Sequence, residues 1–284
     1  MTGKLAFRRE AVNAAMLIAT GVCTLIAAGT LIFILGYLMV QGGSSLSWNS
    51  FTKLPVPVGE SGGGMANAIV GSGKVLLIAS SIGIPIGFLG GVYLSEYGTA
   101  IVGIVVRFAA DLLNGVPSIV IGIFAYAFIV VRVKHFSAYA GGVALGIMMI
   151  PIGVRTTEAF LRTVPQSLRE GAMALGARKE VVIATVVIPA ARRGIAAGML
   201  LNLARVAGET APLLFTALNN QFWSPGFDQP IATLPVMIYT YAIAPYPDWH
   251  RQAWAAGFVL LMLVFTVNIA ARWAIASKTV DQRR

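Results

Sequence analysis

The sequence predicts an all-α integral membrane protein with about six transmembrane helices. Of its 284 residues, 57% are hydrophobic and only 11% are charged, and the mean hydropathy is +0.79. A soluble domain has about a quarter of its residues charged, so too few polar side chains remain here to cover a water-exposed surface. Apolar runs of roughly 20 residues recur along the chain, which is the helix length that crosses a hydrocarbon core about 30 Å thick.

Charge and cysteine content argue against several other classes of protein. The net charge of +10 would suit a nucleic-acid-binding protein. With so few charges overall, it fits better the basic bias of membrane proteins on one side of the bilayer. Cys23 is the single cysteine, so no disulfide and no cysteine metal site can form within the chain. His135 and His250 stand far apart beside loop residues. We therefore expect no catalytic group, no metal site and no cofactor.

The first apolar run covers residues 11–40 and follows Lys4, Arg8 and Arg9. It is too long for the apolar region of a signal peptide, and no small-residue cleavage pattern clearly ends it. We expect a retained first helix with its N-terminus in the cytoplasm. The polar loop at residues 41–66, rich in Gly, Ser and Pro, would then lie outside.

The second predicted span, residues 67–93, contains the sequence GSGK, which ends at Lys74. A nucleotide-binding loop needs G-x-x-x-x-G-K followed by Ser or Thr. Here Ala68 stands in place of the first glycine and Val75 follows the lysine. The motif is therefore not a nucleotide site, and we expect Lys74 to extend toward the lipid headgroups.

Four further apolar runs complete the predicted set, at residues 101–131, 139–160, 194–218 and 253–275. Pro117 is expected to kink the helix of the first of these runs. The proline-rich outer segment, residues 219–251, is expected to include a short helix at 231–242. Basic residues concentrate at the N-terminus, in the connection after the fourth span and in the tail. This distribution indicates six spans with both termini in the cytoplasm.

Several polar residues interrupt the third and fourth spans. Arg107, Asp111 and Asn114 lie one to two turns apart in the third span, and Arg155 lies in the fourth. One interpretation of the group in the third span is an arginine that snorkels at the cytoplasmic end together with one buried polar contact. The other is polar contact with a partner helix or part of a solute pathway. We favour the first. The sequence does not decide whether Asp111 or Arg155 contacts a solute.

The connection at residues 163–192 is polar but patterned. Ser167 and Glu170 fit a capping box, and Gly176 is a suitable helix stop, so we expect a short helix at 168–175. Such a helix either inserts its apolar face into a groove of another protein or lies on the membrane surface. Physical arguments alone do not separate these two alternatives.

This connection resembles a known signature. The stretch EGAMALGARKEVVIATVVIP is similar to E-A-A-x-x-x-G-x9-I-x-L-P of the permease subunits of binding-protein-dependent ABC importers. Four positions match in register: Glu170, Ala172, Gly176 and Pro189. Three depart from the signature by small changes: Gly171 for Ala, Val186 for Ile and Ile188 for Leu.

The resemblance implies a type I ABC importer permease (MetI-like) fold, with residues 1–284 as one permease domain and 163–192 as its cytoplasmic coupling loop. The short helix would be the coupling helix, seated in a cleft of a cytoplasmic ATPase. The residues that the resemblance assigns to ATPase coupling are Glu170, Gly171, Ala172, Leu175 and Gly176.

The fifth predicted span contains two charges, Arg205 and Glu209. Arg205 lies roughly 15 Å into that span, where a charge costs about 2.5–3.5 kcal/mol. At i and i+4 on one helix the two residues would share a face, either as an ion pair that locks helices together or as part of a pathway for a charged solute. A guanidinium presents fixed donors that suit an oxyanion. We expect Glu209 to hold Arg205, and Thr210 to add a hydroxyl.

A second resemblance indicates which solute would be carried. The sequence LARVAGETAPLLFTA is similar to the fifth-helix motif of the phosphate-importer permease family, and NGVPSIVIG, RTTEAF and GGGMANAIVGS resemble the same family. The family's membrane arginine and glutamate fall on Arg205 and Glu209. The resemblance implies a second permease subunit of the PstC kind, two copies of a PstB-type ATPase and an external phosphate-binding protein.

The sequence thus predicts the transmembrane subunit of an ABC importer for inorganic phosphate, located in the cytoplasmic membrane. It is not expected to be an enzyme, because ATP hydrolysis would belong to a partner chain. One alternative is a permease for another oxyanion, such as sulfate, molybdate or phosphonate. Another is a membrane scaffold or sensor of phosphate supply.

Overall fold

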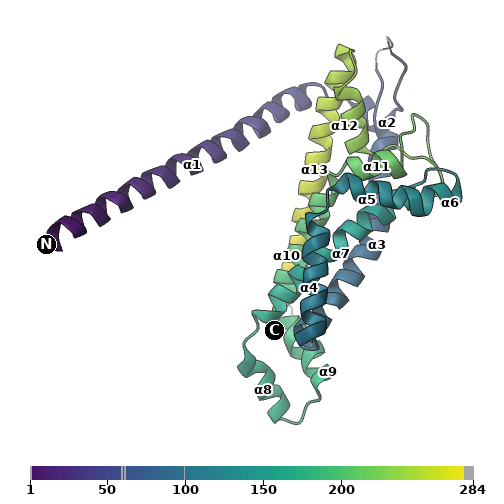
Figure 1. Cartoon of the computed structure of the whole chain (residues 1–284). Coiled ribbons are helices and arrows are strands. Elements are labelled where there is room, and N and C mark those ends of the chain that lie inside the picture. The colour runs from purple at the N-terminus through teal and green to yellow at the C-terminus, as the bar shows by residue number, and fades with distance from the viewer. Residues whose placement is uncertain (1, 59, 61, 99, 278–284) are drawn as a thin grey trace.

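The structure is a computed structural model that describes residues 2–58, 60, 62–98 and 100–277. Within these ranges the chain forms helices joined by turns and loops, without a strand, which confirms the predicted all-α class. Most of the helices lie side by side in an elongated bundle (Figure 1). One end of the bundle carries α8 (Gln166–Ala174) and the other carries α12 (Leu234–Ala242), and we call them the α8 end and the α12 end.

Among the residues that the structure describes, five helices are long and apolar enough to cross a membrane, and a sharply bent pair would make a sixth span. The predicted multi-pass organisation is therefore confirmed. The first, second, fourth and sixth predicted spans each fall inside one of these helices. The five are α1 (Thr2–Ser44), α3 (Ala66–Glu96), α7 (Ala138–Arg162), α13 (Pro247–Ser277) and a helix from Lys179 to Ala207 made of α9 (Lys179–Val182), the π-helical turn η2 (Ile183–Val187) and α10 (Ile188–Ala207).

The third predicted span is not one kinked helix. It consists of α4 (Ala100–Gly115) and a second helix that turns away by 99° after a short break. Pro117 stands at the break and caps the start of α5, because proline has no backbone N–H to donate and disfavours helical geometry in the residue before it. The second helix is made of α5 (Ser118–Ala125), the π-helical turn η1 (Tyr126–Val130) and α6 (Val131–Val133), and α5 crosses the bundle in Figure 1.

The centre of the bundle is the close pair formed by α3 and α7. A Cβ placed on Gly83 would lie 2.4 Å from the Cβ of Met149, and one on Gly91 would lie 2.4 Å from the Cβ of Thr157. Between them, Gly87 lies directly against Gly153. Small residues let two membrane helices approach backbone to backbone, so any larger side chain here would separate the pair.

Helix α1 projects away from the bundle (Figure 1). The C-terminal part of α1 contacts α13. There the ring centroids of Tyr37 and Trp254 lie 5.1 Å apart, edge to face, and Gly42 lies against Phe258. No residue of the apolar window of α1 is buried within this chain. Its long apolar surface therefore faces lipid or another protein.

At the α12 end, short helices and loops cover the bundle. They include α2 (Trp48–Thr52), α11 (Ala211–Thr216) and α12, which lies within the short helix predicted at 231–242. The expectation that Lys74 reaches lipid headgroups is wrong. Its ammonium group donates to the backbone carbonyls of Ser224, Pro225 and Gly226, at 2.7, 3.0 and 3.3 Å. It does so because the loop after α11 presents several carbonyl oxygens to it.

Candidate functional site

The segment that carries Arg205 is interrupted where the sequence predicts a continuous helix. Helix α10 ends at Ala207, Gly208 caps it, and α11 begins only at Ala211 with Pro212 in its first turn. Glycine has a low helix propensity, and the ring of Pro212 would clash with the carbonyl of Gly208 in an unbroken helix. The predicted fifth span at 194–218 is therefore wrong at its C-terminal part.

This break separates the two predicted pathway charges. Glu209 and Thr210 lie outside α10, so Glu209 does not follow Arg205 by one turn on a common helix face. Within the described residues neither Arg205 nor Glu209 makes an ion pair. Arg205 is exposed, and Glu209 and Thr210 are half-buried. The expected Arg205–Glu209 pair is thus absent from the described structure, and the guanidinium of Arg205 is exposed without an ion-pair partner there.

Arg205 lies on a face of α10 that the described part of the chain leaves uncovered near the break. Leu201, Arg205 and Gly208 are exposed at spacings of four and three residues, so they share that face. The adjoining face packs on α7, where Asn202 donates to the carbonyl of Met149 at 2.8 Å. An arginine on a helix inside a membrane is costly against lipid, so this face is best covered by another protein or by a water-filled passage.

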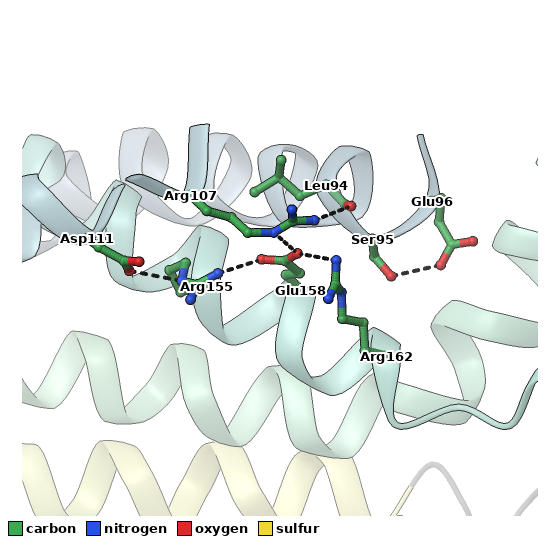
Figure 2. Close-up of polar contacts among 8 residues, drawn as sticks. All are labelled: Leu94, Ser95, Glu96, Arg107, Asp111, Arg155, Glu158 and Arg162. Carbon is green, nitrogen blue, oxygen red and sulfur yellow. Dashed lines mark hydrogen bonds and ion pairs between the residues drawn. The ribbon is translucent and has the colours of Figure 1, made fainter. Parts of the chain in front are cut away.

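A second charged group, which we call the Glu158 cluster, joins α4 to α7 (Figure 2). The carboxylate of Glu158 is 3% exposed and accepts from Arg107 Nε at 2.6 Å, Arg155 Nη1 at 2.9 Å and Arg162 Nη2 at 2.9 Å. Arg155 Nε also contacts Asp111 Oδ1 at 3.0 Å. Three arginines therefore share two carboxylates across the α4–α7 contact.

Sequence reasoning missed Glu158. Its spacing carried a signal, because an acid flanked by Arg155 at i−3 and Arg162 at i+4 presents all three charges on one helix face. Asp111 and Arg155, for which the sequence left two roles open, are brought together as a contact between helices. Asn114 is exposed and makes no hydrogen bond with a described residue.

The short helix of the connection forms at nearly the predicted place, at Gln166–Ala174 instead of 168–175. The capping box does not form, because Pro165 occupies the N-cap and Ser167 lies inside the helix. Gly176 adopts a left-handed φ of +83°, which confirms it as the residue that stops the helix.

The outer surface of α8 is apolar in part. Leu168, Met173 and Leu175 are exposed, and Leu175 is 90% exposed. Glu170 and Gly171 are exposed beside them, while Ala172 is half-buried against the bundle. Exposed apolar side chains on a short helix outside the spans are typical of a surface that docks in a groove.

Comparison with known proteins defines the class. Residues 83–278 match the family described as binding-protein-dependent transport system inner membrane component. This match covers most of the chain and includes the broken helices, the Glu158 cluster, α8 and Arg205. The chain belongs to this family of transport permeases, which are not enzymes.

Curated relatives give a finer likeness. The chain is 44% identical over 276 residues to the phosphate transport system permease protein PstA of Yersinia pestis, covering 97% of this chain and 93% of that protein. It is 43% identical over 265 residues to PstA of Haemophilus influenzae, covering 93% and 94%. The probable PstA of Methanocaldococcus jannaschii is 32% identical over 260 residues, covering 91% and 92%.

Solved structures show the fold. An inward-facing methionine ABC transporter, MetNI, matches with a TM-score of 0.59 at 20% identity, covering 75% of this chain and 96% of that one. A bacterial alginate ABC transporter, solved with an alginate pentasaccharide-bound periplasmic protein, matches with a TM-score of 0.63 at 14% identity, covering 95% and 96%. The fold is therefore that of a type I ABC importer permease, and proteins of this kind work with ABC transporter partners.

Proposed function

We propose that the chain is the transmembrane subunit of an ABC importer that carries inorganic phosphate across the cytoplasmic membrane, with both termini in the cytoplasm. The observation that carries the proposal is the exposed, unpaired guanidinium of Arg205 on the open face of α10. A guanidinium keeps its charge and presents donors in a fixed fork that matches phosphate oxygens. The phosphate permeases among the relatives support this choice of anion.

The open face of α10 also indicates how the pathway is completed. A second permease subunit of the PstC kind would cover this face and form the other wall of the passage. Glu209 and Thr210 follow the helix break, and their oxygen atoms would accept from Arg205 or from a protonated phosphate. Arg205, Glu209 and Thr210 are therefore the proposed pathway residues.

The partners outside the membrane would act at opposite ends of the single permease domain, residues 1–284. A PstB-type ATPase dimer would receive α8, including Glu170, Gly171, Ala172, Leu175 and Gly176, and would use ATP hydrolysis to move it. An external phosphate-binding protein would deliver the anion at the α12 end. The chain supplies the passage and the moving helices, and the partner chain supplies the hydrolysis.

The pathway is tested by labelled-phosphate uptake with Arg205→Gln. Uptake is expected to fall to background while the variant still co-purifies with its partner subunits, because glutamine keeps a polar side chain but loses the fixed charge. Arg9→Gln, which removes an exposed arginine on the projecting helix α1, serves as the matched control and should import phosphate normally.

Other outcomes of this experiment discriminate the alternatives. Normal uptake by Arg205→Gln would contradict the pathway role and favour a scaffold or sensor. Strong competition by sulfate, molybdate or phosphonate in the unmodified complex would instead indicate a different oxyanion.

A further inference from the structure

The coupling helix is tied to the bundle by one buried ion pair. Arg169 on α8 donates from Nη1 to both carboxylate oxygens of Glu96, at 2.5 Å each, and from Nη2 to the backbone carbonyl of Leu161 at 2.7 Å. The two side chains are only 12% and 6% exposed. Glu96 ends α3 and Leu161 lies near the end of α7, so one guanidinium joins three helices.

A second bond holds the other side of the connection to the same place. Lys179, the first residue of α9, donates to the backbone carbonyl of Glu96 at 2.5 Å, and its ammonium lies 4.4 Å from the centre of the Tyr97 ring. The hydroxyl of Ser95 donates to Glu96 at 3.0 Å and fixes the orientation of the carboxylate (Figure 2). The end of α3 is therefore bound twice, by Arg169 within α8 and by Lys179 after it.

Apolar packing contributes little to the position of α8. No apolar side chain of α8 is buried, and the helix contacts the apolar core chiefly through Ala172. A cavity of about 570 Å³ lies behind it, and Arg169, Met173, Arg162 and Val182 line part of its wall. This pocket is partly open to the outside, so α8 lacks close-packed atoms where it faces the pocket, and the polar bonds contribute much of its attachment.

We propose that Glu96 and Arg169 are positioning residues that lock the coupling helix to the ends of α3 and α7, so that displacement of α8 moves this pair of helices as one body. The proposal rests on the proposed function, in which an ATPase docks on α8. Because Gly87 and Gly153 bring α3 and α7 into backbone contact, the pair cannot absorb the displacement by repacking side chains. The Glu158 cluster then passes the movement to α4.

The proposal is tested with the complex of this chain, its second permease subunit and its ATPase, in lipid nanodiscs for hydrogen exchange and in liposomes for transport. The external phosphate-binding protein is supplied in the transport measurement. In Glu96→Gln the carboxylate is replaced at nearly constant volume, so Arg169 loses its charged partner. The amides of residues 166–174 are expected to exchange with deuterated solvent about tenfold faster or more, while those of α3 and α7 keep their protection. The amount of ATP hydrolysed per phosphate imported should rise about threefold or more.

Two further variants make the result specific. Arg169→Lys keeps one charged bond but cannot reach Glu96 and Leu161 together, so it should recover part of the protection and part of the coupling. Glu10→Gln removes an exposed acid on α1, which projects away from both ends of the bundle, and should change neither measurement.

The outcomes test the role of the Glu96–Arg169 pair separately from the proposed function. Unchanged exchange in α8, or an unchanged ratio of hydrolysis to import, overturns the lock. Faster exchange throughout α3 and α7 with loss of the complex also overturns it, since it would show a general role in stability. If the unmodified complex neither binds the ATPase nor imports phosphate, the proposed function fails. The comparison of α8 amide exchange between Glu96→Gln and the unmodified chain still tests whether the Glu96–Arg169 pair holds α8 in place.

Discussion

Two arginines of this chain, Arg107 and Arg205, lie in comparable apolar helices but in opposite surroundings. Arg107 is held by the buried carboxylate of Glu158 and also donates to the carbonyl of Leu94. Arg205 is exposed and has no carboxylate partner among the described residues. A paired charge in a membrane protein fastens helices, whereas an unpaired one keeps its binding capacity for a ligand or a partner. The contrast therefore separates a charge that fastens helices from one that has no carboxylate partner among the described residues.

The largest effect on stability is expected for Glu158→Leu. This change leaves Arg107, Arg155 and Arg162 without their shared carboxylate, and breaking a buried ion pair by removing one partner costs about 3 kcal/mol or more. The thermal unfolding midpoint of the purified chain in detergent, followed by tryptophan fluorescence, should fall clearly. Glu10→Leu on α1 removes an exposed acid and is the control.

An unchanged midpoint for Glu158→Leu would show that the cluster does not fasten α4 to α7. The difference between paired and unpaired arginines would then have no bearing on stability.

A smaller effect is expected for Asp111→Asn. Asp111 is 56% exposed, and an ion pair so open to its surroundings contributes less than about 1 kcal/mol. Arg155 keeps its bond to Glu158, so the helix contact should survive with a slightly lower midpoint. A loss as large as that of Glu158→Leu would mean that Asp111 is covered by a partner subunit, which repeating the measurement in the assembled complex would reveal.

The smallest effect on stability is expected for Arg205→Gln, within about 0.5 kcal/mol, because the side chain makes no bond that the isolated chain would lose. The same variant is expected to lose uptake. A marked drop in the midpoint would place Arg205 among the charges that fasten helices, and its distinction from Arg107 would no longer hold.

Most of the membrane spans could be predicted from the sequence, because the hydrophobicity of about 20 consecutive residues reports directly on burial in lipid. The points at which the helices break and change direction could not be predicted in this way. Pro117 is expected to kink one helix, yet the two parts turn by 99°, and the break after Ala207 escapes the hydropathy pattern altogether. Apolar residues continue through both breaks, so hydrophobicity alone carries no signal for either.

The candidate site shows the same division. Arg205 and Gly176 are singled out by local rules: a charge inside an apolar run, and a glycine after a short helix. Glu158 depends on Arg107, which lies 51 residues away, and Arg169 depends on Glu96, 73 residues away. Contacts at such separations are set by how the helices pack, and a single sequence read by itself contains no direct record of that packing.

The glycines that bring α3 and α7 together have a mechanical consequence. Near the α8 end the bundle is stiff, because two helices touch through their backbones and ion pairs fasten their neighbours. Both helix breaks, at Pro117 and after Ala207, lie farther toward the α12 end, where Gly122 of α5 rests on Pro212 of α11. A displacement applied at the α8 end would therefore move α3 and α7 as a rigid body, and the change in backbone direction would fall at the two helix breaks, which would act as hinges.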